Sequence, residues 1–266
     1  MFKNKVVAIT GGTEGIGKAL VELFLEKGAS VGTCSRTQSK LDILAESLPG
    51  KNLSTFRADV SKEEDCKNFI KGVLEKYGKI DILINNAGIS MRAMFRDVEI
   101  STLKQLMDIN FWGAVYCTKY ALASITENKG SIVGVSSIAG FRGLPGRSGY
   151  SASKFALNGW LEALRTELLH SGVNVMWVCP GFTKSNIRNA ALNHEGKAQG
   201  ESPLEENKLM TSETCATHIM KAISRRRRTL VLTLTGKQTV LLNKYFPSLA
   251  DKLTHRFFFK DGILKK

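Results

Sequence analysis

Short apolar runs alternate with segments of helical period along nearly the whole chain. The apolar runs are rich in Val and Ile and mostly lack polar alternation, which is typical of strands buried on both faces of a parallel sheet. The segments between them carry apolar residues three and four positions apart, as amphipathic helices do. This pattern predicts an α/β fold: a doubly wound parallel sheet of about seven strands with helices on both faces. The predicted strands lie at 5–10, 29–34, 52–59, 80–88, 130–137, 173–181 and 229–233.

One domain is expected, because neither a low-complexity linker nor an internal repeat divides the 266 residues. The N-terminal apolar run is too short for a signal peptide, and no run reaches the length of a membrane span. The five cysteines form no C-x-x-C motif, so we expect no disulfide framework, no metal site and a reducing, cytoplasmic compartment. The formal net charge of +14 indicates an anionic partner, such as a phosphorylated cofactor, a membrane surface or nucleic acid.

A glycine-rich turn, TGGTEGIG at residues 10–17, follows the first predicted strand and precedes the first predicted helix. Gly11, Gly15 and Gly17 would permit a tight turn and let the backbone approach a pyrophosphate at the positive end of the helix dipole. An ordinary strand-to-helix turn is the alternative, since the spacing departs from G-x-G-x-x-G. The position within the first β-α-β unit favours dinucleotide binding.

Tyr150 and Lys154 stand four residues apart at the start of a predicted helix, in the sequence YSASK. Residues at this spacing lie one above the other, so the ammonium group can sit beside the phenol. A chance pairing of two polar residues is the alternative. Motifs elsewhere in the chain favour a functional pair.

Several motifs resemble those of the classical short-chain dehydrogenases/reductases, in the same order, up to about residue 235. Any one of them could arise by chance, but together they are specific. The resemblance implies a Rossmann-type fold and an oxidoreductase that transfers a hydride between nicotinamide and an alcohol/ketone substrate. The motifs are TGGTEGIG at 10–17, ADV at 58–60, NNAG at 85–88, Asn110 in DIN, SS at 136–137, YSASK at 150–154 and PG at 180–181.

The resemblance implies four catalytic residues. It makes Tyr150 the general acid/base, Lys154 its activator and Asn110 part of a proton relay. Ser137 would orient the substrate, because the family's usual spacing to the tyrosine selects it over Ser136. A phenol with a reference pKa of about 10 is almost entirely protonated at pH 7, so a nearby ammonium and a cationic nicotinamide must favour the phenolate. Packing of Asn110 in a buried helix and local hydrogen bonding by Ser137 are the structural alternatives.

The resemblance also implies the residues that bind the cofactor. Asp59 and Val60 would contact the adenine, although Asp59 could instead cap the end of a strand. Thr183 and Ser185 would hold the nicotinamide carboxamide, and the family more often has Thr in place of Ser185. The full set comprises Gly11, Thr13, Gly15, Ile16, Gly17, Ser35, Arg36, Asp59, Val60, Asn86, Ala87, Gly88, Tyr150, Lys154, Pro180, Gly181, Thr183 and Ser185.

The end of the second predicted strand favours NADP over NAD. NAD-dependent enzymes usually place an acidic residue about 20 residues beyond the glycines, whereas a 2′-phosphate calls for an arginine and rejects a carboxylate. Ser35 occupies the acidic position and Arg36 follows it, with Thr13 and Thr37 as further candidate ligands. Glu14 argues against NADP, because some NADP-dependent relatives have a basic residue at this position. A solvated Arg36 is the alternative.

The sequence says less about the substrate. A long polar segment at about 182–212 is expected to form a mobile lid, as this region does in the family. We expect a bulky, hydrophobic substrate such as a steroid- or lipid-like carbonyl compound. Five apolar residues would either line its pocket or pack in the interior: Met91, Met94, Phe95, Phe141 and Leu144.

The domain is expected to span residues 1–235, with a basic amphipathic extension of the same domain at 236–266. Pro247 should begin a second short helix there. The pattern indicates either an interfacial helix on an anionic membrane or a stripe that packs on the domain or on a partner subunit. The apolar positions are Leu242, Tyr245, Phe246, Leu249, Leu253 and Phe257, and the basic ones are Lys237, Lys244, Lys252, Arg256, Lys260, Lys265 and Lys266.

Two other functions compete with an NADP-dependent oxidoreductase. A dinucleotide-binding sensor or scaffold would need little catalysis, and the intact Asn, Ser, Tyr and Lys argue against it. A nucleic-acid-binding protein is suggested by the net charge and by RRRR at 225–228, but no aromatic-rich binding module accompanies this run. We expect a homodimer or homotetramer and no nucleic-acid partner.

Overall fold

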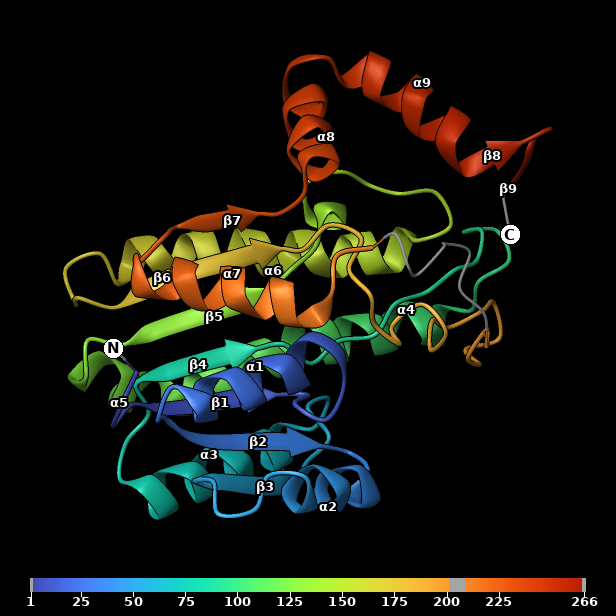
Figure 1. Ribbon diagram of the computed structural model, residues 1–266. Helices are drawn as coiled ribbons and strands as arrows, with labels where there is room; N and C mark the ends of the chain where they lie inside the picture. Colours follow the sequence, from blue (N-terminus) through green and yellow to red (C-terminus); the bar gives the residue numbers. More distant parts are fainter. Residues whose placement is uncertain (1, 201–208, 265–266) are drawn as a thin grey trace.

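The computed structural model describes residues 2–200 and 209–264, which form a three-layer α/β body and a C-terminal helical hairpin (Figure 1). Part of the expected lid, 201–208, and the lysines at 265 and 266 lie outside the described residues. The body is built on a sheet of seven parallel strands in the order β3-β2-β1-β4-β5-β6-β7. The predicted fold class and strand number are therefore confirmed. The strands are β1 (Val6–Thr10), β2 (Ser30–Ser35), β3 (Leu53–Arg57), β4 (Ile82–Asn85), β5 (Ser131–Val135), β6 (Asn174–Cys179) and β7 (Thr229–Val231).

The central strands are apolar throughout because helices cover both faces of the sheet. In β1, Val7 and Ile9 belong to one core cluster, whereas Val6 and Ala8 belong to the other. Successive side chains of a strand point to opposite faces, so every residue of β1 is buried. This arrangement explains why the sequence shows apolar runs without polar alternation.

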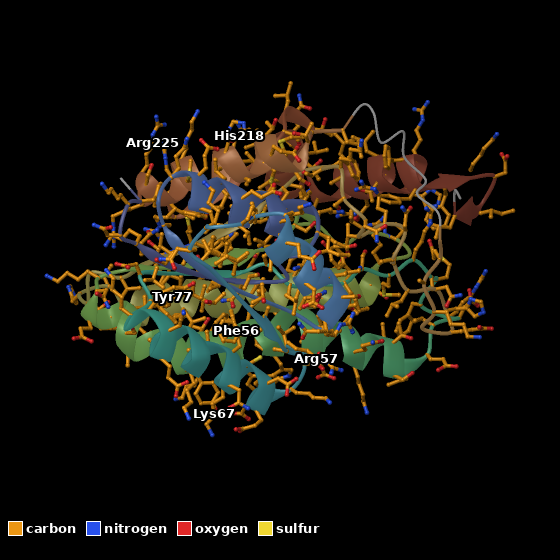
Figure 2. All side chains as sticks on the ribbon, turned by 60° about the horizontal axis from the view of Figure 1, so that its bottom comes forward. Phe56, Arg57, Lys67, Tyr77, His218 and Arg225 are labelled. Atoms are coloured by element: carbon orange, nitrogen blue, oxygen red, sulfur yellow. The ribbon has the colours of Figure 1, made fainter. Side chains whose placement is uncertain are left out.

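Two helical layers supply the covering faces. One layer contains α1 (Gly15–Glu26), α2 (Gln38–Glu46) and α7 (Ser212–Ser224), and the other contains α3 (Glu63–Tyr77), α5 (Gly113–Glu127) and α6 (Ser148–Glu167). Figure 2 shows α7, marked by His218 and Arg225, and α3, marked by Lys67, on opposite sides of the sheet. The pattern of α3 fits its boundaries, since three acidic residues lie in its first turn and Gly78 ends it with a φ of +77°.

Residues 101–125 have the apolar spacing of one continuous helix, but the structure interrupts it. It consists of α4 (Ile100–Met107), a five-residue π-helix η1 (Asp108–Trp112) and α5. The wider turn changes the direction of the side chains that follow α4, and Asn110 lies in the middle of it. The interruption therefore falls on a predicted catalytic residue.

The arginine run at 225–228 has structural partners. Arg226 adopts a φ of +48° and donates hydrogen bonds to the carbonyl oxygens of Lys129 and Gly172. Arg165 donates to the carbonyl oxygen of Arg228 at 2.8 Å and stacks over the ring of Trp177 at 4.3 Å. The run thus ties the turn between α7 and β7 to the neighbouring loops.

The hairpin of α8 (Leu234–Tyr245) and α9 (Pro247–Phe258) projects beyond β7 and is followed by the short strands β8 (Phe259–Lys260) and β9 (Ile263–Leu264) (Figure 1). Pro247 begins α9, as predicted. Arg142 anchors the hairpin, because it donates hydrogen bonds to Asn243 at 2.9 Å and to Asp251 at 2.5 Å. None of the helices that the structure describes has the length and apolar character that crossing a membrane requires.

Candidate active site

One cavity of about 1050 Å³ lies at the carboxyl ends of the strands. It spans the point where the strand order reverses, between β1 and β4, which is where ligands bind in doubly wound sheets. All eighteen predicted cofactor residues line it, together with Ser137. The described part of the chain therefore brings the separate sequence motifs into one continuous site.

The glycine-rich turn forms the floor of the cavity and needs its glycines. Gly11 has a φ of +69°, in the left-handed region. A Cβ at Gly17 would collide with the carbonyl oxygen of Gly11. Asn86 braces the turn, since its Nδ2 donates to the carbonyl oxygens of Thr10 at 2.9 Å and Gly11 at 3.0 Å. Asn86 is thus a support of this turn as well as a residue of the cavity wall.

Asp59 and Val60 line one end of the cavity. The carboxylate of Asp59 accepts hydrogen bonds from the backbone N–H and the hydroxyl of Ser61, at 3.0 and 2.8 Å. The structural alternative is therefore also present, because Asp59 caps the turn that follows β3 while it faces the cavity.

Arg36 and Lys40 put two cations at the rim of the cavity beyond β2. Both line it, as do Ser35, Thr37 and Thr13, and the hydroxyl of Thr13 donates to that of Ser35 at 3.3 Å. Lys40 binds the carboxylate of Glu14 at 2.8 Å. The sequence interpretation missed Lys40, the third residue of α2, although a second basic residue four positions after Arg36 was a signal that could have found it.

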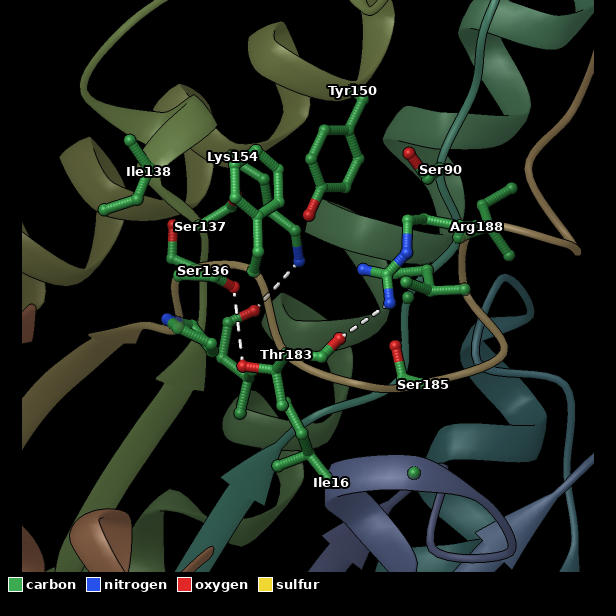
Figure 3. Close-up of a pocket in the computed structure, with 18 of the residues that line it drawn as sticks. Ile16, Ser90, Ser136, Ser137, Ile138, Tyr150, Lys154, Thr183, Ser185 and Arg188 are labelled. Carbon is green, nitrogen blue, oxygen red and sulfur yellow. Dashed lines mark hydrogen bonds between the residues drawn. The ribbon is translucent and has the colours of Figure 1, made fainter. Parts of the chain in front are cut away.

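Tyr150 and Lys154 lie on the first turns of α6, and Ser137 comes from the end of β5 (Figure 3). Lys154 is 4% exposed, and its Nζ donates to the carbonyl oxygen of Val135 at 2.9 Å and lies 5.8 Å from the centre of the Tyr150 ring. The hydroxyl of Ser137 also accepts a hydrogen bond from the N–H of Ala139 at 3.1 Å. This local bond begins the short 3-10 helix η2 (Ile138–Gly140), as the structural alternative expects.

Burial sets the protonation states of this group. It raises the pKa of Tyr150, and the hydrogen bond with Ser137 and the positive charge of Arg147 oppose the rise. Burial also lowers the pKa of Lys154 to about 8. At neutral pH the site therefore holds a protonated phenol, which can donate a proton, beside a lysine that is still mostly charged.

Asn110 lies beside this group and does not line the cavity. Its Oδ1 accepts from the N–H of Ile89 at 2.8 Å, and its Nδ2 donates to the carbonyl oxygen of Ile89 at 3.0 Å and to Ser153 Oγ at 2.9 Å. Ser153 in turn donates to the carbonyl oxygen of Tyr150 at 2.8 Å. The π-helix thus couples the loop after β4 to the start of α6.

The segment that follows β6 forms another part of the cavity wall. Thr183 is 4% exposed and Ser185 packs beside Gly15, where an added Cβ would lie 3.2 Å from the Cβ of Ser185. Arg188 donates to the carbonyl oxygen of Thr183 at 2.9 Å and is 6% exposed (Figure 3). The residues expected at the nicotinamide carboxamide therefore lie between the glycine-rich turn and Tyr150.

The expected apolar wall differs from the observed one. Of the five candidates only Leu144 lines the cavity. Met91 is fully buried in a cluster with Leu106 and Leu192, and Phe95 is 69% exposed. The apolar wall comes instead from the hairpin and the residue after Gly181: Phe182, Leu241, Leu242, Tyr245, Phe246, Leu253, Phe257 and Phe258.

A family model for short chain dehydrogenases matches residues 5–196. The 11-beta-hydroxysteroid dehydrogenase A of Arachis hypogaea is 34% identical over 93% of this chain and 74% of its own length. A dehydrogenase/reductase SDR family protein 7-like of Dictyostelium discoideum is 32% identical, over 96% and 82% respectively.

Solved structures agree with the fold. A short chain dehydrogenase/reductase from Burkholderia phymatum in complex with NAD has a TM-score of 0.82 and 23% identity, over 93% of this chain and 95% of its own. An alcohol dehydrogenase from Thermococcus sibiricus, complexed with 5-hydroxy-NADP, has a TM-score of 0.76 and 22% identity, over 86% and 95%. On the family model and the curated relatives, this chain belongs to the short-chain dehydrogenase/reductase family of oxidoreductases.

Proposed function

We propose that the protein is an NADP-dependent oxidoreductase that interconverts a bulky, hydrophobic alcohol and its ketone. The observation that carries the proposal is the convergence of Tyr150, Lys154 and Ser137 on the cavity that starts at the glycine-rich turn. The names of relatives such as the 11-beta-hydroxysteroid dehydrogenases support a steroid- or lipid-like substrate.

The residues of the cavity fit a nicotinamide dinucleotide. Glu14 precedes α1 and makes no side-chain cap, so the N–H groups of the first turn are left for an anion such as a pyrophosphate. Gly17 has no side chain and lies close to Gly11, so a ligand can approach the backbone of the glycine-rich turn directly. When bound, the nicotinamide would exchange a hydride with the carbon of the alcohol/carbonyl group.

The protein's own residues would handle the proton. In the direction of reduction, Tyr150 gives its hydroxyl proton to the carbonyl oxygen of the substrate. Ser137 donates a hydrogen bond to the same oxygen as negative charge develops there. Lys154, held by the carbonyl oxygen of Val135, stabilises the phenolate that remains.

Asn110 is proposed to continue the proton path from Lys154. A Cβ at Gly88 would lie 3.1 Å from Asn110 Oδ1 and 3.5 Å from Lys154 Nζ, so the two polar groups face the same small space beside Gly88. Its hydrogen bonds to Ile89 also hold the loop after β4. Asn110 thus combines support of this loop with a place next to the ammonium group.

Arg36 is expected to select NADP. A guanidinium at the rim would bind a 2′-phosphate by charge-assisted hydrogen bonds, with Lys40 beside it. Arg36→Ala should lower the ratio of kcat/KM for NADPH over NADH by roughly tenfold or more. Steady-state kinetics with both cofactors measures this ratio. Arg57→Ala is the matched control, because Arg57 stands beside Ser35 on the neighbouring strand and outside the cavity.

In the Arg57→Ala control, the ratio of kcat/KM for NADPH over NADH should not change. If Arg36→Ala also leaves it unchanged, Arg36 is a solvated loop residue and the NADP proposal loses its main support. The partial neutralisation of Lys40 by Glu14 leaves Arg36 as the stronger of the two cations, so the larger effect belongs to Arg36.

The hairpin is proposed to open the cavity towards an anionic membrane surface. Apolar side chains on it remain exposed, among them Tyr245 at 59% and Phe246 at 63%. Five basic residues and only two acidic ones lie in residues 236–264. Of α9 only Ala250 is buried, so packing on the domain accounts for little of this apolar surface. An exposed apolar face with a basic surround suits an interfacial helix.

The protein is expected to co-sediment with vesicles of phosphatidylglycerol and not with vesicles of phosphatidylcholine, and to be released from them by salt. Phe246→Ser combined with Leu249→Ser should abolish this binding. Ile43→Ser combined with Ile100→Ser is the control, because these residues are 63% and 62% exposed on α2 and α4. Equal recovery in the supernatant with both lipids would instead make the hairpin a packing or subunit-contact element.

Three further expectations belong to the same proposal. Exposed aromatic side chains on η1 and α6 would contact a second copy in a homodimer or homotetramer, since Trp112 is 42% and Phe155 46% exposed. A reducing, cytoplasmic setting fits five free, buried cysteines. We also propose residues 1–235 as the catalytic part and 236–266 as its extension, because the sheet ends at Val231 and the hairpin begins at Leu234, two residues before this boundary.

A further inference from the structure

Arg147 places a positive charge in the wall of the cavity, three residues before Tyr150. It is the residue that precedes α6, and its side chain lines the cavity beside Ser90. Arg147 Nη1 donates to Ser90 Oγ at 3.5 Å, a long contact for a charged donor. The proposed hydride and proton chemistry does not use this charge.

The described residues around Arg147 do not neutralise its charge. Burial and the charges of Arg92 and Arg188 lower its pKa, while Tyr150 acts in the opposite direction. In the part of the chain that the structure describes, no carboxylate forms an ion pair with Arg147. A guanidinium that is held in a partly buried wall without an anion is costly unless a ligand supplies one.

Tyr150 separates this charged wall from an apolar one. In Figure 3, Ser90 and Arg188 lie on one side of the Tyr150 hydroxyl, and Ser137 and Ile138 lie on the other. The hairpin begins on the side of Ile138, because a Cβ at Gly236 would contact its side chain at 2.8 Å. The reacting oxygen would therefore sit between a cationic wall and an apolar wall.

We propose that Arg147 binds a carboxylate of the substrate, so that the substrate class is an amphiphilic oxo acid or the corresponding hydroxy acid. Its carboxylate lies on the Arg147 side of the reacting carbon, and its apolar part extends along the hairpin. The planar guanidinium can form two parallel hydrogen bonds to a carboxylate, and the hydroxyl of Ser90 is available for a third. This assignment rests on the alcohol/carbonyl chemistry proposed above and narrows its substrate.

The test compares acids with their neutral esters. Medium-chain oxo acids with the ketone at different positions, and the methyl ester of each, are assayed with the wild type, Arg147→Gln and Arg147→Lys. For each protein, kcat/KM for the oxo acid is divided by kcat/KM for its methyl ester. Comparison of this acid/ester ratio between proteins cancels any difference in intrinsic reactivity between the acid and the ester. Arg96→Gln is the control, because Arg96 is on the loop after β4 with its side chain 81% exposed, paired with Asp97 and outside the cavity.

The wild type should prefer the acid for at least one ketone position. Arg147→Gln should lower the acid/ester ratio by roughly tenfold or more, mainly through the KM of the acid. Arg147→Lys should give an intermediate acid/ester ratio, since lysine keeps the positive charge but cannot form the two parallel hydrogen bonds of a guanidinium. The acid/ester ratio of Arg96→Gln should match that of the wild type. An equal preference for acid and ester in the wild type, or an equal loss for both in Arg147→Gln, would overturn the proposal.

A binding measurement separates this proposal from the oxidoreductase function. Calorimetry with dodecanoate and with its methyl ester needs no turnover, and thermal unfolding shows whether each variant is folded. Dodecanoate should bind the wild type and lose affinity in Arg147→Gln, whereas binding of the ester should not change. If no ketone is reduced but dodecanoate binding depends on Arg147, the proposed reaction is wrong and the carboxylate site stands. If dodecanoate binds both proteins equally, the carboxylate site is wrong.

Discussion

Tyr150→Phe is expected to lower kcat by at least ~100-fold and to leave NADPH binding intact. The substitution keeps the ring, which packs with Met91 and Leu106 in a buried cluster, and removes only the hydroxyl group that is proposed to donate the proton. Because burial raises the pKa of Tyr150, the wild-type phenol is protonated at neutral pH and ready to donate. Single-turnover kinetics and NADPH fluorescence titration on one preparation measure the two quantities.

Tyr120→Phe provides the control for Tyr150→Phe. It also removes a phenolic hydroxyl from the face of a helix, but this hydroxyl donates to Glu63 at 2.7 Å at the surface. Tyr120 does not line the cavity, so the kcat of Tyr120→Phe should equal that of the wild type. A Tyr150→Phe enzyme that turns over as fast as Tyr120→Phe would show that another group supplies the proton.

Ser137→Ala should cause the second large loss, roughly 100-fold in kcat with a smaller change in KM. Ser137 lines the cavity, its hydroxyl opposes the rise that burial causes in the pKa of Tyr150, and we propose that it donates a hydrogen bond to the substrate oxygen as charge develops there. The Ser137→Ala substitution should therefore slow mainly the hydride-transfer step and have little effect on substrate binding. A rate comparison with NADPH and with its 4-deuterated form tests whether hydride transfer has become slower.

Ser136→Ala distinguishes this role from general packing at the end of β5. Ser136 is the adjacent residue and also lines the cavity, but its hydroxyl lies next to the thiol of Cys179 rather than Tyr150. Its loss should change kcat by only a few-fold. If the two alanine variants lose activity equally, the assignment of the orienting serine to position 137 is wrong.

The sheet could be predicted from the sequence because one physical cause produces its pattern. Strands that are covered on both faces must be apolar at successive positions, and β1 shows this with Val6, Val7, Ala8 and Ile9. The predicted cofactor residues line one cavity for a related reason. Most of the motifs follow a strand, and parallel strands bring their carboxyl ends together at one edge, whereas Tyr150 and Lys154 reach the same cavity from α6.

The π-helix at Asp108–Trp112 could not be predicted in the same way. The apolar spacing of three and four continues through the segment, so the pattern alone favours one unbroken helix. The interruption arises from long-range contacts, since Asn110 bonds to Ile89 and Ser153, which are 21 and 43 residues away. Such contacts leave no local period in the sequence.

The cationic wall and the apolar wall also depend on contacts between loops. Arg147 reaches the cavity because the loop after β4 meets the loop before α6, where the N–H of Ala93 donates to the carbonyl oxygen of Gly146 at 3.0 Å. Met91 turns inward in the same loop, and Phe95 points to solvent. Loops have no side-chain periodicity, so residue type alone does not indicate which side chains face a ligand.

The reversal of strand order between β1 and β4 has a consequence for how the chain folds during synthesis. Val7 pairs with Ile82, and the N–H of Val6 donates to the carboxylate of Asp81 at 2.9 Å, so the centre of the sheet closes a loop of about 75 residues. Pairings of such long separation form slowly, because the entropy of closing the loop is lost before the contacts form. The strands β1, β2 and β3 are made before β4 and leave one side of β1 unpaired until β4 arrives. From then on β5, β6 and β7 add outward in chain order, each beside the strand made just before it. The nascent chain therefore carries an unpaired apolar strand edge, on β1, while about 75 further residues are made, and an edge of this kind is prone to aggregation.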